Sequence, residues 1–183
     1  MLVVTGCFAV PFLQTSSPEG TTTTVIIVRH AERDPGFDPP LIEEGVQRAE
    51  ALKEALAENG VTAIYTTDLI RNVQTVQPLA DELGLTVNRV SPVLFADIAS
   101  TAAFVVDEIF RLHAGGTVLF CGNRGAQPVD DVVIAGINEE IYRRLGGTGR
   151  APERYADMYI AVVPEEGETR FIKTEYGGPS SLD

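Results

Sequence analysis

An arginine and a histidine stand together where a short apolar run ends. Arg29 and His30 follow residues 25–28, a β-branched run typical of a strand buried on both faces. Ligands of open parallel sheets bind beyond the carboxyl ends of the strands, so this pair is placed to meet a ligand. An unprotonated imidazole is a nucleophile towards phosphorus, and a guanidinium is a rigid two-pronged donor for phosphate oxygens. An isolated pair of this kind is more often structural, so the phosphoryl chemistry that it suggests needs further residues.

A second arginine occupies the corresponding place after the next strand. Residues 61–66 are expected to form that strand, and Arg71 falls in the first turn of the helix that follows it. Arg71 lies off the apolar stripe of this helix and can reach over the strand ends, where the helix N-terminus also favours an anion. Taken alone, it fits a solvated helix arginine equally well. Together with Arg29 and His30, it defines a candidate anion site.

Short apolar strands alternate with amphipathic helices from residue 25 onward. The expected strands are residues 25–28, 61–66, 85–90, 117–121, 157–163 and 169–175, and the expected helices are 43–58, 69–83, 101–112 and 129–145. This alternation with short connections predicts a three-layer α/β/α fold, in which a mostly parallel sheet carries a C-terminal antiparallel hairpin. One domain over residues 25–176 is expected, after an apolar leader and flexible linker (1–24) and before a tail (177–183).

Two polar residues are the expected N-caps of helices, and the apolar positions define buried faces. Asp68 is expected to cap the helix that contains Arg71, and Ser100 the helix that ends at Leu112. The helical spacing also places Val46 and Leu112 on faces that pack against the sheet.

Composition excludes several classes of protein. The chain has 183 residues, with 14 Lys and Arg against 26 Asp and Glu, which gives a net charge of −12. Such an acidic field repels polyphosphate backbones, so we expect no nucleic-acid partner, and any anionic ligand needs a local cluster of cations. Two His and two Cys in the chain show no metal-ligand spacing, so we expect no metal and no cofactor. No apolar run reaches the roughly 18 residues of a transmembrane span.

The N-terminal segment leaves localisation open between two alternatives. Residues 4–7 (VTGC) resemble the lipobox at which bacterial lipoproteins are cleaved and acylated, which would make Cys7 a lipid anchor. No basic segment precedes them and the apolar stretch is short, so either the true start lies upstream or the segment is an unstructured leader. An exported or membrane-anchored protein and a cytoplasmic one are equally compatible with this segment. Cys121 lies in an expected core strand, so we expect no disulfide with Cys7.

Five segments, in order along the chain, resemble the histidine phosphatase superfamily, also called the phosphoglycerate mutase-like family, and in particular its small bacterial members. The segments are VIIVRHAER (25–33), LIEEG (41–45), YTTDLIRNVQT (65–75), GTVLFCG (116–122) and ADMYIAVVPEEGETRFIKTEYG (156–177). The resemblance implies a phosphatase that forms a phosphohistidine on His30 without a metal, with Arg29 and Arg71 on the phosphoryl oxygens. The partner would be a small phosphorylated substrate or a phosphate anion. A mutase of phosphoglycerate is not expected, because the chain is short.

The sequence departs from the family at one catalytic position. Where the family has a second histidine after the GTVLFCG strand, this chain has Asn123. An amide donates a neutral hydrogen bond without positive charge, and losing such a donor costs about 10²–10³ in rate, judging from oxyanion-hole deletions. His113 is expected at the end of the preceding helix and cannot replace it. Arg124 either supplies the missing charge or is a surface loop cation.

The general acid that protonates the leaving oxygen has two candidates. Asp97 has the position used by larger family members, and Glu32 lies beside the Arg-His pair. Each also fits a plain surface or capping carboxylate. Two hypotheses about function therefore remain: a phosphatase with slow or specialised turnover, and a non-catalytic phosphate-binding relative. Asn123 favours the second, and the retained His30, Arg29 and Arg71 favour the first.

Overall fold

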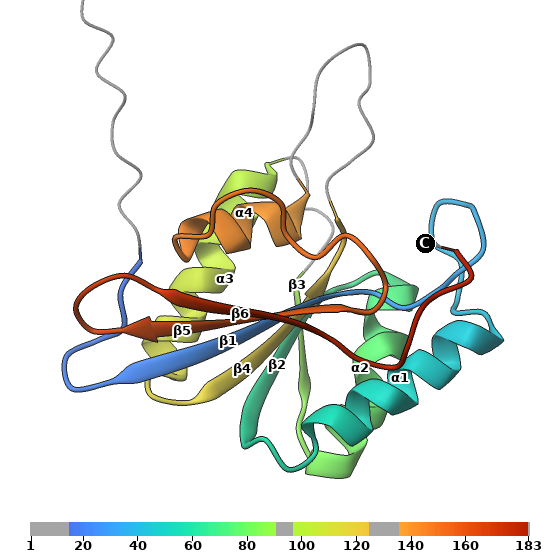
Figure 1. Ribbon diagram of the computed structural model, residues 1–183, viewed down its shortest axis with the longest axis horizontal. Helices are drawn as coiled ribbons and strands as arrows, with labels where there is room; N and C mark the ends of the chain where they lie inside the picture. The colour runs from blue at the N-terminus through green and yellow to red at the C-terminus, as the bar shows by residue number, and fades with distance from the viewer. Residues whose placement is uncertain (1–14, 91–96, 125–135, 183) are drawn as a thin grey trace, which may run out of the picture.

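The computed structural model describes residues 15–90, 97–124 and 136–182 (Figure 1). In chain order the elements are β1 (Thr22–Arg29), α1 (Glu43–Leu56), β2 (Val61–Thr67), α2 (Ile70–Leu83), β3 (Val87–Val90), α3 (Ile98–Leu112), β4 (Thr117–Gly122), α4 (Ile137–Arg144), β5 (Asp157–Pro164) and β6 (Arg170–Glu175). The expected alternation is confirmed. Much of the first half of the helix expected over residues 129–145 lies outside the described residues.

The six strands form one sheet in the order β3-β2-β4-β1-β5-β6. The pairs β1–β4, β2–β4 and β2–β3 are parallel, whereas β1–β5 and β5–β6 are antiparallel. The expected fold class, a mostly parallel sheet with a terminal antiparallel hairpin, is therefore confirmed. Arg29 at the end of β1 is in register with Gly122 at the end of β4, so residues that follow these two strands meet at one edge.

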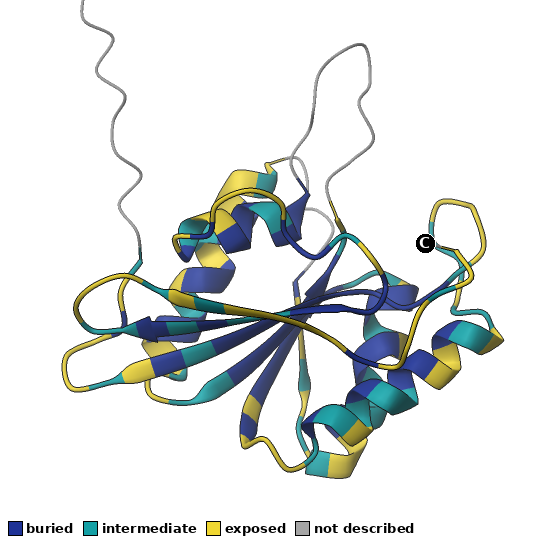
Figure 2. Ribbon diagram, in the orientation of Figure 1, coloured by how far each residue is buried: buried dark blue, intermediate teal, exposed yellow. Residues whose placement is uncertain are grey.

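Helices cover both faces of the sheet and enclose two core layers (Figures 1 and 2). Helices α3 and α4 pack over Phe120 of β4, and helices α1 and α2 pack over Leu119 on the other face. Adjacent strand residues point to opposite faces, so a continuous apolar run such as that of β4 fills both layers.

Two apolar residues expected in these layers are exposed instead. Val46 of α1 is 53% exposed and Leu112 of α3 is 50% exposed. The buried faces of these helices run through Ala49 and Leu52 in α1 and through Val105 and Ile109 in α3, and the two exposed residues lie at their margins.

Both expected helix caps are also wrong. Helix α2 begins at Ile70, whose backbone N–H donates to the carboxylate oxygens of Asp38 at 3.0 and 3.2 Å, so Asp68 is not the cap. Helix α3 begins at Ile98, and Asp97 is its N-cap, accepting the backbone N–H of Ser100 at 3.1 Å. The capping carboxylates are therefore Asp97, three residues before the expected cap Ser100, and Asp38, from a loop distant in sequence from Asp68.

The residues just before position 25, expected to be flexible linker, are packed on the fold. Strand β1 begins at Thr22, and Ser17 is buried with its backbone N–H donating to the carbonyl of Pro164 at 2.9 Å. The hydroxyls of Ser17 and Thr23 are hydrogen-bonded to each other at 2.6 Å, which satisfies both polar groups in a buried position. Cys121 is fully buried as a free thiol, and Cys7 lies outside the described residues.

A close approach of two backbones holds the start of α1 against the segment after β1. An atom added at the Cβ position of Gly45 would lie 2.1 Å from the carbonyl oxygen of Glu32 and 2.9 Å from its nitrogen. Only glycine therefore allows α1 to pack here, two residues beyond the Arg29–His30 pair.

We expect Gly45→Ala to lower the free energy of unfolding by about 2 kcal/mol or more, because the methyl group must displace backbone rather than a side chain. Urea unfolding monitored by circular dichroism measures this change. Val46→Ala, at the exposed neighbouring position of the same helix, is the control and should stay within about 0.5 kcal/mol. A Gly45→Ala protein as stable as this control would contradict the packing argument.

Candidate active site

The carboxyl end of β1 carries the first two predicted site residues into the interior. Arg29 is 7% exposed and His30 is 3% exposed. The backbone N–H of His30 donates to the carbonyl of Gly122 at 3.1 Å, which extends the β1–β4 pairing to the histidine itself. Arg29 donates from Nη1 to the carbonyl of Glu153 at 2.8 Å, and its guanidinium lies 3.7 Å from the centre of the Tyr155 ring. The strand end thus holds both side chains in fixed places.

Arg71 reaches the same place from the first turn of α2. It donates from Nη2 to Oδ1 of Asn123 at 3.1 Å, and from Nη1 to the carbonyl of Phe37 at 3.1 Å. Its Nε is buried and has no hydrogen-bond partner among the described residues. A buried guanidinium N–H without a partner is suited to an oxyanion ligand, because an oxygen of the ligand would accept its hydrogen bond.

A threonine joins the two elements that carry these arginines. The hydroxyl of Thr75 donates to the carbonyl of Arg71 at 2.7 Å and accepts the backbone N–H of Ala31 at 2.8 Å. Thr75 and Ala31 are both buried. The start of α2 is therefore fixed directly against the residue that follows His30.

His30 holds a neutral ring in a defined tautomer. Burial is the main cause that lowers the pKa of His30 to about 3, and the charges of Arg29, Arg71 and Arg33 lower it further. Desolvation of the buried ring is a larger effect on this pKa than the arginine charges. Nδ1 lies 2.8 Å from the carbonyl oxygen of Ala31, and since a carbonyl only accepts, Nδ1 carries the proton. Nε2 is thus the unprotonated nitrogen.

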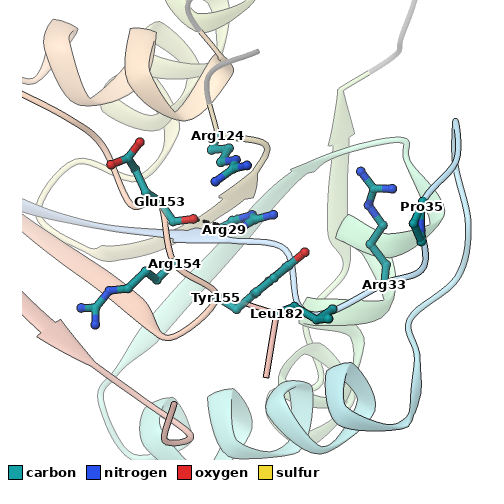
Figure 3. A pocket seen from close by; sticks show the side chains of 8 residues that line it. All are labelled: Arg29, Arg33, Pro35, Arg124, Glu153, Arg154, Tyr155 and Leu182. Carbon is teal, nitrogen blue, oxygen red and sulfur yellow. Dashed lines mark hydrogen bonds between the residues drawn. The ribbon is translucent and has the colours of Figure 1, made fainter. Parts of the chain in front are cut away.

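An open pocket of about 540 Å³ lies against Arg29 (Figure 3). Its lining combines four arginines with one carboxylate, an aromatic ring and two apolar side chains: Arg29, Arg33, Pro35, Arg124, Glu153, Arg154, Tyr155 and Leu182. Tyr155 connects the pocket to the nucleophile candidate, because its ring meets that of His30 edge-on with the ring centres 5.8 Å apart. The pocket therefore lies next to His30 across the Tyr155 ring, although His30, Arg71 and Asn123 are not among the residues that line it.

The two predicted general acids do not join this cluster. Glu32 is fully buried, and its carboxylate accepts hydrogen bonds from Nε of Arg48 at 2.7 and 2.9 Å. Asp97 is exposed and serves as the cap of α3, where hydrogen bonds from Ser100 lower the pKa of its carboxyl. Neither carboxyl group lines the pocket.

His113 is also remote from the cluster, as expected. Its Nε2 is hydrogen-bonded to the hydroxyl of Tyr65 at 3.1 Å, at the C-terminus of α3. In the part of the chain that the structure describes, no group of three or more His, Cys, Asp or Glu could hold a metal ion. No helix in the described ranges is long and apolar enough to cross a membrane.

The sequence argument missed Asp38, which supports two parts of the site. Its carboxylate forms an ion pair with Nη1 of Arg71 at 3.1 Å and accepts the first backbone N–H of α2. Asp38 belongs to the Pro- and Gly-rich loop 34–40, 33 positions before Arg71, so no local spacing signals the contact. Tyr155 was missed for the same reason, since it lies far along the chain from Arg29.

Part of the chain is similar to a family of known proteins. Residues 25–92 match the model of the histidine phosphatase superfamily (branch 1). A curated relative, the 8-oxo-(d)GTP phosphatase of Mycolicibacterium smegmatis, is 42% identical over 69 residues, which are 34% of this chain and 21% of the relative. The chain therefore spans about a fifth of the length of that relative.

Solved structures share the fold over most of the chain. The phosphoglycerate mutase of Bacillus anthracis has a TM-score of 0.61 at 15% identity, covering 84% of this chain and 93% of that one. A mycobacterial glucosyl-3-phosphoglycerate phosphatase with inorganic phosphate has a TM-score of 0.54 at 14% identity, covering 85% and 97%. The family model thus matches the part of the chain that carries Arg29, His30 and Arg71, and the solved structures show a shared fold.

We expect the His30 imidazole to remain neutral from pH 8 down to about pH 4, because its pKa is lowered to about 3. Long-range ¹H–¹⁵N spectra of the two histidines measure this directly, with His30→Gln to assign the signals. A His30 midpoint near the ordinary value of about 6.5 would contradict the burial argument.

The same pKa shift affects stability at low pH. The unfolded chain binds a proton on His30 below about pH 6.5, and the folded protein does so only near pH 3. The unfolded state is therefore favoured as the pH falls through this window, by up to about 1.4 kcal/mol per pH unit. Urea unfolding at pH 7 and pH 4.5 should show a smaller loss of stability in His30→Gln than in the wild type; equal losses would sink the idea.

Proposed function

We propose that this protein hydrolyses phosphomonoesters by forming a phosphohistidine on Nε2 of His30. The observation that carries the proposal is the neutral, buried His30 ring with the guanidinium groups of Arg29 and Arg71 around it. The chain's phosphatase relatives support the same class of reaction.

The reaction divides between the nucleophile and the arginines. Nε2 of His30 attacks phosphorus, the bond from phosphorus to the ester oxygen breaks, and that oxygen leaves with a proton from solvent. Water then attacks the phosphohistidine and releases phosphate. Arg29 and Arg71 neutralise the phosphoryl oxygens throughout, which is where most of the stabilisation in phosphoryl transfer is needed. The proposal assigns no side chain as general acid.

Asn123 limits this chemistry. Its amide oxygen accepts a hydrogen bond from Arg71, so it occupies a donor that the phosphoryl group would use. It also brings no positive charge. The same contact favours the second candidate function, a phosphate-binding protein that does not turn over, and kinetics separate the two.

We expect slow hydrolysis of p-nitrophenyl phosphate by the wild-type protein, and none above the uncatalysed rate by His30→Ala. Phosphate release in steady state measures this. His113→Ala is the matched control, since it removes the only other histidine of the chain, at a site remote from the cluster. If wild type and His30→Ala are equally inactive, yet vanadate binds the wild type in calorimetry, the non-catalytic alternative holds.

Restoring a histidine at position 123 should raise turnover. We expect Asn123→His to increase kcat for p-nitrophenyl phosphate at least tenfold, which corresponds to about 1.4 kcal/mol of barrier. The reason is that an imidazolium can supply charge to the transferring phosphoryl group, which an amide cannot. Asn59→His, at an exposed position after α1, controls for an added histidine. A wild-type rate equal to that of Asn123→His would show that another group, such as Arg124, already performs this role.

A further inference from the structure

The pocket beside Arg29 contains more positive charge than one phosphoryl group requires. Arg29 and Arg71 already provide the pair of guanidinium groups for that group in the proposed function. Arg33, Arg124 and Arg154 also line the pocket, in a chain whose net charge is −12. Its volume of about 540 Å³ falls in the range of sites that hold a whole small molecule.

Only some of these cations face the shared space (Figure 3). The guanidinium of Arg124 stands beside that of Arg29, and the guanidinium of Arg33 stands on the other side of the Tyr155 hydroxyl. The side chain of Arg154 points away, and its charge is compensated by ion pairs with Asp157 and Glu175. The carboxylate of Glu153 also points away.

Arg33 is held in place but not neutralised. Its Nη1 donates to the carbonyl oxygens of Asp34 at 2.8 Å and Gly36 at 3.2 Å, which fixes the guanidinium through neutral groups. Within residues 15–90, 97–124 and 136–182, neither Arg33 nor Arg124 forms an ion pair with a carboxylate. Burial lowers the pKa of Arg71, and the positive charge of Arg33 lowers it further, which shows that the two guanidinium groups repel each other.

Cations held near one another without counter-charges destabilise a site until an anion binds between them. A single phosphoryl group at Arg29 and Arg71 would leave Arg33 uncompensated. The apolar side of the pocket, formed by Pro35, Leu182 and the ring of Tyr155, can cover the uncharged part of a ligand that reaches both places.

We propose that Arg33 and Arg124 form a second anion subsite, so that the preferred substrates carry another phosphate group beside the one at His30. This assignment rests on the proposed function, because it names the substrate class of the same pocket. The shared chemistry is a pair of phosphates on one small molecule, either directly linked as in a diphosphate ester or separated by a carbon chain as in a bisphosphate.

Binding of non-hydrolysable phosphonates tests the subsite without turnover. Methylphosphonate provides one group, methylenediphosphonate two adjacent groups, and 1,3-propylenediphosphonate two separated groups. Isothermal titration calorimetry at low salt should give at least tenfold tighter binding for one of the diphosphonates than for methylphosphonate, as expected from one added charge-assisted contact. Which diphosphonate binds more tightly distinguishes the two substrate types.

Matched arginine variants locate the second group. Arg33→Ala and Arg124→Ala should each weaken the preferred diphosphonate by about fivefold or more, and change methylphosphonate binding by less than about twofold. Arg170→Ala removes an exposed arginine at the start of β6, at the far end of the sheet, and should change neither.

The outcomes separate this inference from the proposed function. If methylphosphonate binds and the second phosphonate adds no affinity, the second subsite is overturned while the proposed function stands. If Arg124→Ala weakens all ligands equally, Arg124 acts on the first phosphoryl group, in the role left open by Asn123, and the subsite assignment is overturned. If no phosphonate binds the wild type, both fail.

Discussion

A buried ion pair between Glu32 and Arg48 holds the region around the nucleophile candidate together. The two side chains are almost completely inaccessible, and Nη2 of Arg48 lies 2.7 Å from Oε1 of Glu32. Arg48 also donates to the backbone carbonyls of Tyr176 and Gly178, so one guanidinium joins the end of β1, helix α1 and the C-terminal segment. Loss of either partner would leave a buried charge, typically at a cost of about 3–5 kcal/mol. The carboxylate of Glu32 therefore has a structural role: through Arg48 it stabilises the region that carries the proposed catalytic residues.

Because the carboxylate of Glu32 binds Arg48 and does not line the pocket, the pocket keeps an excess of positive charge in a chain that is acidic overall. Asp38 compensates Arg71 from the side of the loop, and Asp157 and Glu175 compensate Arg154 outside the pocket. The charges of Arg29, Arg71 and Arg33 act on the His30 ring, which burial keeps neutral, so the ring adds no further positive charge to the site. The electrostatic design is local, and the overall charge of the protein says nothing of the sign of its site.

The sequence predicted the features that depend on local periodicity. Alternating apolar patterns predict the order of strands along the chain and the mixed sheet. The edge at which parallel strands end predicts that four residues lie close together: Arg29, His30, Arg71 and Asn123. The features that failed depend on contacts between distant segments. Asp38, and not Asp68, accepts the first backbone N–H of α2. Glu32 follows His30 by two residues, yet its side chain binds Arg48 and does not line the pocket. Adjacency in sequence does not give the direction in which a side chain points after its strand ends.

The central place of β1 in the sheet has a consequence for how the chain folds. β1 is the earliest strand in the sequence, yet both of its neighbours, β4 and β5, come from the second half of the chain. During synthesis its β-branched run has no partner on either edge until those segments emerge, which is the condition in which strands pair with other molecules. Such long-range pairing also slows folding, because the chain must close large loops before any contact compensates the lost entropy. The position that gives His30 its burial therefore ties formation of the site to the synthesis of β4 and β5, which follow β1 by about 90 residues or more.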